Sequence, residues 1–339
     1  MNFRVDAVLQ WYPERFRSGG VTLPPDGPGF SDAIVLRVET DAGPHCLRGW
    51  QADADPERIG GLHRLLAHAT YQGIGFVACP VPASDGRTIV SSAGRNWQLE
   101  PWLPGRADFS SRPSDGRLTE ALRSLARLHS AMAGFQPRGT ETHWFFSHAA
   151  MPAPAVVERS ERLAGWSDEK LAQLCSRIEQ TPECCAGFNV AATSILGGFS
   201  RHSKTIAAEL RAASRLHVRV QPCLRDVWHD HLLFEGDTVT GIVDPGAARS
   251  DTVAADISRL VGSLVGDDRR RWELAIEAYR SVRPLTSEEL RLIGVLDRSG
   301  TLLSGMTWLA RRYFANVTIP QPERVAGRMQ KIAERLAAL

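Results

Sequence analysis

The sequence predicts an α+β protein of two lobes, a small sheet-containing lobe over residues 1–103 and a larger, mainly helical lobe over residues 104–339. Three observations carry this prediction. Strand-like segments dominate the first hundred residues, helical spacing of apolar residues dominates the rest, and a proline-containing connector separates the two patterns. The length of 339 residues, of which 43% are hydrophobic, suits two lobes at about 150 residues each.

The small lobe begins with a loop and a predicted β-hairpin. Residues 18–29 contain four glycines and three prolines, which is typical of a loop. Residues 33–39 (AIVLRVE) and 45–50 (HCLRGW) are rich in apolar and β-branched side chains. Because a short turn, TDAGP, separates them, we expect two antiparallel strands joined as a hairpin.

One helix and further strands complete this lobe. Asp55 is a favourable N-cap and Pro56 is suited to the first helical position, so a helix is expected from residue 56 to about residue 69. Further strand-like segments follow at residues 74–79, 88–91 and 96–99. The connector Glu-Pro-Trp-Leu-Pro-Gly, residues 100–105, then leads out of the lobe.

The large lobe is predicted to be helical with one exception. Helices are expected at residues 117–133, 155–180, 203–215, 252–264, 269–281, 286–297, 300–315 and 321–338. The exception is a short island of β-like sequence over residues 217–244.

Composition excludes several classes of function. The formal charge of +2 argues against a dedicated nucleic-acid binder, which normally carries a strongly basic surface. No stretch approaches the ~20 apolar residues of a membrane span, and the first sixteen residues do not resemble a signal peptide. The six cysteines form no CxxC pair, which predicts reduced thiols and a cytoplasmic location.

The β-like island carries the main candidate for chemistry. Its sequence reads as a polar loop, a strand, a tight turn, a second strand and then a carboxylate. A hairpin of this kind would bring Asp226, His231 and Asp244 to the same end. Two carboxylates and an imidazole at one place can bind a divalent metal and still supply a general base.

At this point the sequence resembles the aminoglycoside phosphotransferase family, which has a bilobal protein-kinase-like fold. The family's catalytic loop, H-G-D-x-x-x-x-N, is matched by Leu224-Arg225-Asp226, four residues, and His231. Its metal-binding segment is matched by residues 241–246 (GIVDPG). Residues 251–257 and 125–129 (LARLH) are similar to two helical segments of the family.

The small lobe shows the same resemblance. Residues 29–32 (GFSD) are similar to the phosphate loop, and residues 46–48 (CLR) stand where the family has a strand ending in Lys or Arg. Residues 99–105 (LEPWLPG) are similar to the hinge pattern M-E-W-L-P-G. The resemblance covers about residues 20 to 265.

The resemblance implies an ATP-dependent kinase that acts on a hydroxyl of a small molecule, with Mg²⁺ or Mn²⁺ as the metal. Asp226 would accept the proton of the attacking hydroxyl. Asp244 and His231 would bind the metal that bridges the nucleotide phosphates. Because imidazole is softer than the amide oxygen it replaces, His231 would favour Mn²⁺ over Mg²⁺.

The same resemblance implies five residues of the nucleotide site. Arg48 would bind the phosphates and could pair with Glu57 of the following helix. Ser31 would contact phosphate oxygens. Glu100 and Trp102 would belong to the hinge, where the backbone N–H of Trp102 would bond to adenine.

Two alternatives stay open at this stage. The family's usual residues are replaced by Leu224, Arg225, His231 and Arg48, which favours a catalytically weak or inactive nucleotide-binding pseudokinase with an interaction role. Retained Asp226 and Asp244 speak against it. A metallohydrolase could use His229 and His231 with the same carboxylates, and bound zinc would identify it. The acceptor and the oligomeric state are not encoded in any motif. Aromatic residues of the large lobe that could line an acceptor pocket are Trp144, Phe145, Phe146, Trp166, Trp308, Tyr313 and Phe314.

Overall fold

The chain forms two compact units, each built from several stretches of sequence. The structure is a computed structural model that describes residues 5–17, 20–23, 33–319 and 321–339. The first unit contains Met1–Phe146, Pro222–Arg249 and Ala278–Arg283, and the second contains Ser147–Gln221, Ser250–Glu277 and Pro284–Leu339. The N-terminal sheet and the hairpin of the candidate site therefore belong to one unit. The lobe boundary at residue 103 stays a prediction.

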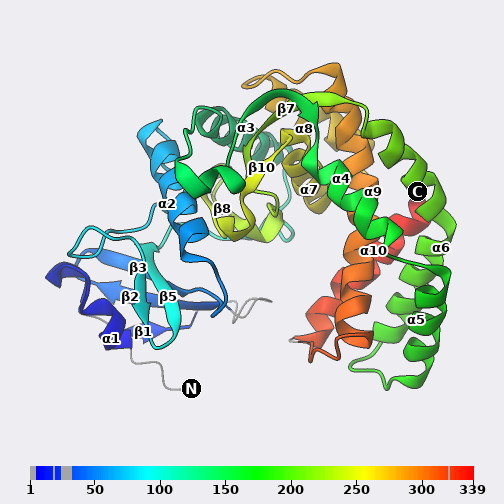
Figure 1. The fold of residues 1–339 in the computed structure, drawn as a ribbon, viewed down its shortest axis with the longest axis horizontal. Helices are drawn as coiled ribbons and strands as arrows, with labels where there is room; N and C mark the ends of the chain where they lie inside the picture. Colours follow the sequence, from blue (N-terminus) through cyan, green and yellow to red (C-terminus); the bar gives the residue numbers. More distant parts are fainter. Residues whose placement is uncertain (1–4, 18–19, 24–32, 320) are drawn as a thin grey trace. The chain divides into compact units, whose positions relative to one another are not determined.

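A five-stranded antiparallel sheet organises the first unit (Figure 1). Its strands lie in the order β1-β2-β3-β5-β4, with bounds Val21–Thr22, Ile34–Thr40, Gly43–Gly49, Arg95–Pro101 and Val90–Ser92. The predicted hairpin is confirmed as β2 and β3, in which Val38 lies opposite His45. The expected strand at residues 74–79 is wrong, because only Val77 forms an isolated bridge, to Ile242.

Side chains alternate between the two faces of this sheet. On one face Leu47, Trp97 and Leu99 join a buried apolar cluster together with Tyr12, which follows helix α1 (Val5–Leu9). On the other face, β3 and β5 carry charged and polar residues that form the candidate site. This alternation follows from the two-residue period of a strand.

Helix α2 (Pro56–Tyr71) forms where the sequence predicts it. The side chain of Asp55 accepts a hydrogen bond of 2.8 Å from the backbone N–H of Glu57, as expected of an N-cap. The buried residues of α2 include Ile59, Leu62 and His63. Helix α2 therefore contributes both apolar contacts and one buried imidazole.

The connector after β5 leads to helix α3 (Asp115–Met132) and packs against a small hairpin. The hairpin consists of β8 (Leu232–Glu235) and β9 (Thr238–Ile242). The hydroxyl of Thr240 donates to the Pro104 carbonyl at 2.6 Å. A Cβ at Gly105, whose φ is +97°, would lie 2.3 Å from the Thr240 hydroxyl, so this position requires glycine.

The second unit is mainly helical and contains most of a three-stranded sheet, in the order β10-β7-β6. The strands are β6 (His148–Pro152), β7 (His217–Cys223) and β10 (Arg249–Asp251), and the helices are α4 (Pro154–Ala164), α5 (Asp168–Gln180), α6 (Phe188–Ala213), α7 (Val253–Val265), α8 (Arg269–Arg280), α9 (Ser287–Tyr313) and α10 (Pro322–Ala338). Strand β6 was not predicted. Within the described residues, none of the helices has the length and apolar character needed to span a membrane.

Three predicted helix boundaries in this unit are wrong. Helix α6 begins at Phe188, where a start at residue 203 was expected. The helix expected over residues 155–180 is divided, because α4 ends at Gly165 and Ser167 caps the start of α5. Conversely, the two helices expected over residues 286–297 and 300–315 are the single helix α9. Ser299 is accommodated there because its hydroxyl donates to the Val295 carbonyl one turn earlier.

Candidate nucleotide-binding and catalytic site

Arg48 of β3 lies at the centre of the polar face of the sheet. Its Nη1 donates to Oδ1 of Asp244 at 2.9 Å, and its Nε lies 3.8 Å from Oε1 of Glu100. The Arg48 side chain is 10% exposed and that of Glu100 8%, whereas that of Asp244 is 46% exposed. A buried guanidinium is thus balanced by one buried and one accessible carboxylate.

The pKa shifts of these groups agree with this arrangement. Burial works against the charge of Arg48, but the carboxylates of Asp244 and Glu100 outweigh it and raise the Arg48 pKa. Burial raises the pKa of Glu100, and the charge of Arg48 limits that rise. Partial burial also disfavours the Asp244 carboxylate, but Arg48 and His231 outweigh this effect and hold its pKa below the usual range.

The expected partner of Arg48 is not the observed one. Glu57 lies in the first turn of α2 with an exposed side chain. The ion pairs of Arg48 within the described residues are those to Asp244 and Glu100. The pairing of Arg48 with Glu57 is therefore corrected. The physical reason is the strand pairing. Gln98 of β5 lies opposite Arg48, and Glu100 follows Gln98 by two residues, so the side chains of Gln98, Glu100 and Arg48 lie on the same face of the sheet.

A chain of hydrogen bonds continues from Glu100 to helix α2. Gln98 Nε2 donates to Glu100 Oε2 at 2.5 Å, and Gln98 Oε1 accepts from Trp50 Nε1 at 2.6 Å and from His63 Nε2 at 2.7 Å. Nδ1 of His63 accepts from the Thr88 hydroxyl at 2.7 Å. His63 is neutral in this arrangement, and burial lowers its pKa to about 4.

Sequence reasoning did not identify His63 or Gln98 as part of the site. A signal for Gln98 was present in the alternation Trp97-Gln98-Leu99-Glu100, which places two polar residues on one face of a strand. His63 gave no such signal, because a lone histidine on an otherwise apolar helix face is common in protein cores.

The β8–β9 hairpin brings the three residues predicted for catalysis and metal binding together. His231 Nδ1 donates to the backbone carbonyl of Asp226 at 2.8 Å, and His231 Nε2 lies 3.8 Å from Asp244 Oδ2. The backbone N–H of Val243 donates to the His231 carbonyl at 2.9 Å. The side chains of Asp226 and Asp244 are both exposed to solvent.

Two residues of this site have left-handed backbone conformations. Arg225 has a φ of +67° and Asp244 a φ of +56°. Such conformations cost about 1 kcal/mol or more for residues other than glycine, and they occur preferentially at functional sites. The family that the sequence resembles has glycine at the position of Arg225, and glycine adopts a left-handed conformation without strain. Leu224, in contrast, is buried and fills apolar space.

Loop residues after Asp244 are held by α2. Arg58 Nη2 donates to the backbone carbonyl of Gly246 at 2.7 Å and lies 3.3 Å from that of Ala248. This interaction ties the segment that carries Asp244 to the helix next to the sheet. The position of Asp244 is therefore supported from two directions, by Arg48 of β3 and by Arg58 of α2.

The hydrogen bonds of His231 do not favour it as a metal ligand. Trp228 Nε1, which can only donate, contacts His231 Nε2 at 2.7 Å, so this nitrogen accepts. His231 Nδ1 faces a carbonyl oxygen and must donate. Both ring nitrogens are thus engaged, and the geometry assigns His231 to holding the loop of Asp226 in place. Asp244 offers an accessible carboxylate, a ligand type that suits Mg²⁺ or Mn²⁺.

Ser31 and Trp102 are the remaining residues that were predicted for the nucleotide site. Ser31 lies outside the described residues. The backbone N–H of Trp102 donates to the Pro44 carbonyl at 3.1 Å, so it extends the sheet and does not offer a donor to adenine. The assignment of this N–H is corrected, because Trp102 continues the pairing of β5 with β3 beyond Pro101. Its indole stacks with Arg37, whose guanidinium lies 5.3 Å from the ring centre.

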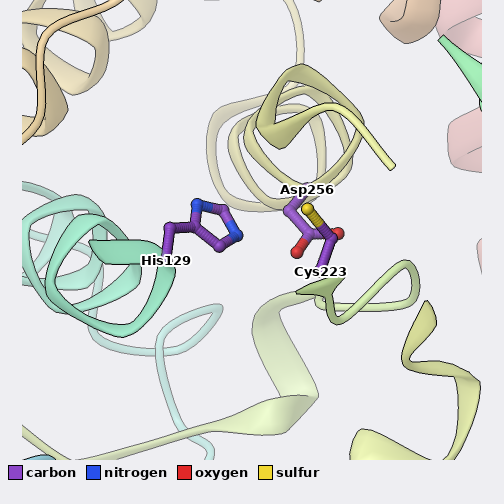
Figure 2. A group of neighbouring side chains, drawn as sticks. All are labelled: His129, Cys223 and Asp256. Carbon is purple, nitrogen blue, oxygen red and sulfur yellow. The ribbon is translucent and has the colours of Figure 1, made fainter. Parts of the chain in front are cut away.

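His129 of α3 is a buried core histidine. Its Nδ1 lies 2.8 Å from the hydroxyl of Tyr279. The His129 imidazole and the Cys223 thiol are within 4.8 Å of each other, and Figure 2 draws both, together with Asp256 of helix α7 in the other unit. His129 and Cys223 together offer two ligand atoms, whereas a structural zinc site needs four. All six cysteines lie in the described part of the chain and are free thiols.

Comparisons with known proteins show which family the chain belongs to. A family model described as "Phosphotransferase enzyme family" (APH) matches residues 22–293. The chain is 24% identical over 326 residues to a homoserine kinase from Rhizobium etli strain CIAT 652, covering 93% of this chain and 89% of that protein. It is 26% identical over 270 residues to a homoserine kinase from Gluconacetobacter diazotrophicus, covering 78% and 72%.

Solved structures show the same fold. An aminoglycoside phosphotransferase from Alicyclobacillus acidocaldarius has a TM-score of 0.66 at 17% identity, covering 98% of this chain and 92% of that one. Amicoumacin kinase hAmiN in complex with AMP-PNP and Ca²⁺ has a TM-score of 0.60 at 16% identity, with the same coverage. The predicted bilobal α+β kinase-like fold is confirmed by these similarities. Because the family model matches most of its length, the chain belongs to the APH phosphotransferase enzyme family.

Proposed function

We propose that this protein is a kinase that transfers the γ-phosphoryl group of ATP to a hydroxyl of a small molecule. The observation that carries the proposal is the contact between Arg48 of the sheet and Asp244 of the hairpin segment. A guanidinium, which can bind phosphate oxygens, lies next to an accessible carboxylate, a ligand type that divalent metals use, and this pairing supports the proposal. Transfer of a phosphoryl group depends mainly on such positioning and charge neutralisation.

In the proposed reaction Asp226 accepts the proton of the acceptor hydroxyl. The acceptor oxygen then bonds to the γ-phosphorus, the bond to the β–γ bridging oxygen breaks, and ADP leaves. Arg48 binds phosphate oxygens through its guanidinium. Asp244 would hold Mg²⁺ or Mn²⁺, which supplies neutralisation of phosphate charge when bound. His231 keeps the loop of Asp226 in position through the backbone carbonyl of Asp226.

The curated relatives support a choice of first acceptor. The two described above are named homoserine kinases, and each aligns with more than two thirds of this chain. Homoserine carries a primary hydroxyl of the kind that Asp226 would deprotonate. We therefore propose a small hydroxyl-bearing amino acid as the first acceptor to test, followed by spectinomycin, which a structural neighbour binds.

The test is a transfer assay on the purified chain. ADP formation from ATP is measured with Mg²⁺ and with Mn²⁺, in the absence of acceptor and with each acceptor in turn. We expect acceptor-dependent ADP formation that falls at least about 10³-fold in Asp226→Asn. Turnover that is unchanged in Asp226→Asn would contradict the role of this carboxylate.

One observation favours a second candidate, a nucleotide-binding module without turnover. Both nitrogens of His231 are engaged, which leaves Asp244 as the one predicted metal ligand with an oxygen open to an ion. The same assay separates the candidates. ATP-dependent thermal stabilisation with no ADP formation under any acceptor or metal would support the non-catalytic module.

A further inference from the structure

Arg48 has two carboxylate partners that differ in one respect. Asp244 contacts it at 2.9 Å and is 46% exposed, whereas Glu100 lies at 3.8 Å and is 8% exposed. An exposed partner is open to exchange with a ligand. A buried partner is not, because removing its counter-charge would leave an uncompensated charge in a low-dielectric environment.

Glu100 is also the better anchored of the two. Its second oxygen accepts from Gln98 Nε2 at 2.5 Å, and Gln98 is itself fixed by Trp50 Nε1 and His63 Nε2. Trp50 Nε1, both ring nitrogens of His63 and both amide atoms of Gln98 each have a hydrogen-bond partner within the first unit. Satisfied buried networks of this kind hold their members in one geometry.

From these contacts we propose that Glu100 is the positioning residue for Arg48. The proposal rests on the proposed function. It assigns to Glu100 of β5 the pairing with Arg48 that the resemblance implied for Glu57 of α2. Glu57 at the start of α2 is exposed and forms no ion pair with Arg48 in the described structure, while Glu100 of β5 supplies a counter-charge. Helix α2 remains connected to the site through the uncharged pair His63 and Gln98.

The two carboxylates then have different tasks. Asp244 is the exchangeable partner, which gives up Arg48 when metal and phosphate bind. Glu100 is the permanent partner, which keeps the guanidinium aligned after Asp244 is engaged by the metal. Loss of Glu100 should therefore weaken the binding of phosphates, and it should do so through Arg48 alone.

A double-mutant cycle tests this proposal. The dissociation constant of a fluorescent ATP analogue is measured with Mn²⁺ present for wild type, Glu100→Gln, Arg48→Gln and the double variant. We expect Glu100→Gln to weaken binding at least tenfold in the wild-type background and less than twofold in the Arg48→Gln background. An equal loss in both backgrounds would show a purely structural role and overturn the proposal.

Further variants keep the result interpretable. Glu39→Gln makes the same change at an exposed glutamate of β2 and serves as the matched control. A tenfold loss with Glu57→Gln and none with Glu100→Gln would return the role to the helix. If Glu100→Gln does not fold, Glu100→Asp keeps the charge on a shorter side chain, and we expect a threefold loss that again vanishes in the Arg48→Gln background.

The outcome also separates this proposal from the proposed function. If the wild type binds the ATP analogue and Glu100→Gln binds it equally well, the role of Glu100 is rejected while the kinase function stands. If the wild type does not bind the analogue at all, the proposed function is rejected, and the role of Glu100 is rejected with it.

Discussion

The two faces of the N-terminal sheet use the same strands for opposite purposes. On one face, Leu47, Trp97 and Leu99 are buried with apolar residues of the same sheet and of the segment after α1. On the other face, their sequence neighbour Arg48 forms ion pairs with Glu100 and with Asp244. The apolar face stabilises the fold by burying apolar side chains, and the polar face carries charged side chains.

The difference shows how far each face depends on distant sequence. The apolar cluster draws on residues from the first hundred positions alone. Arg48 instead contacts Asp244, a residue 196 positions away. We therefore expect truncation of an apolar-face side chain to affect mainly stability and loss of a charged polar-face side chain to affect mainly function, and the first two predictions test that separation.

The largest expected effect is on activity, from Asp244→Asn. This change removes the accessible carboxylate but leaves Arg48 paired with Glu100. We expect kcat/KM for ATP to fall at least about 10³-fold, equivalent to roughly 4 kcal/mol, because charge stabilisation of the phosphates is lost. The free energy of unfolding, measured in urea, should change by no more than about 1 kcal/mol, as for other exposed charges. A large loss of stability with little loss of activity would reverse the proposed separation.

The next effect is on stability, from Trp97→Ala on the apolar face. Trp97 is 1% exposed, and its truncation should destabilise the protein by about 3–5 kcal/mol. Urea unfolding monitored by circular dichroism measures this change. At a temperature where the variant is folded, its KM for ATP should stay within threefold of the wild-type value. A selective rise in KM without loss of stability would show that the two faces are not separate.

A third prediction concerns pH and the buried His63. Burial lowers its pKa to about 4 in the folded chain, against about 6.5 when unfolded. Between these values the unfolded chain binds the proton and the folded chain does not, so stability falls as pH drops from about 6.5 to about 4, by up to about 3 kcal/mol. His63→Gln should remove this part of the pH dependence, measured by urea unfolding across that range. His217→Gln, at an exposed histidine, is the control and should leave the profile unchanged.

The smallest expected effect concerns the start of α2, the helix that carries His63. Asp55→Ala removes the side-chain acceptor for the Glu57 backbone N–H and should cost about 1 kcal/mol of stability. Asp55→Asn retains an acceptor and should cost only a few tenths of that. Equal losses in the two variants, measured by thermal or urea unfolding, would show that the cap does not act through this hydrogen bond.

Local features of the fold were predictable from sequence because their causes are local. The cap at Asp55, the β2–β3 hairpin and the β8–β9 hairpin each depend on residues within about a dozen positions. The boundaries that were wrong depend on weaker local signals. Ser167 began a new helix inside an otherwise helical pattern, and Ser299 was tolerated inside α9 because of its bond to Val295.

The resemblance named residues for the candidate site, and their roles stay predictions, whereas the hydrogen-bond and ion-pair partners of these residues could not be predicted. The resemblance pointed to Asp226, Asp244 and Arg48, and the structure shows His231 next to the backbone of Asp226 and next to the carboxylate of Asp244. It could not specify that Glu100 pairs with Arg48, because that depends on which face of β5 lies toward β3. Nor could the resemblance show that Trp228 Nε1 donates a hydrogen bond to His231 Nε2, because a hydrogen bond between two side chains of one loop leaves no pattern in the sequence.

The most direct test of the central claim compares the binding of ATP and of adenosine by titration calorimetry, for wild type and Arg48→Gln. The account predicts that the affinity for ATP falls at least tenfold in the variant, while the affinity for adenosine stays within twofold, because the proposed role of Arg48 is to bind phosphates and not the nucleoside. Equal losses for both ligands, or an undiminished affinity for ATP, would contradict the claim that the polar face of this sheet binds the nucleotide phosphates.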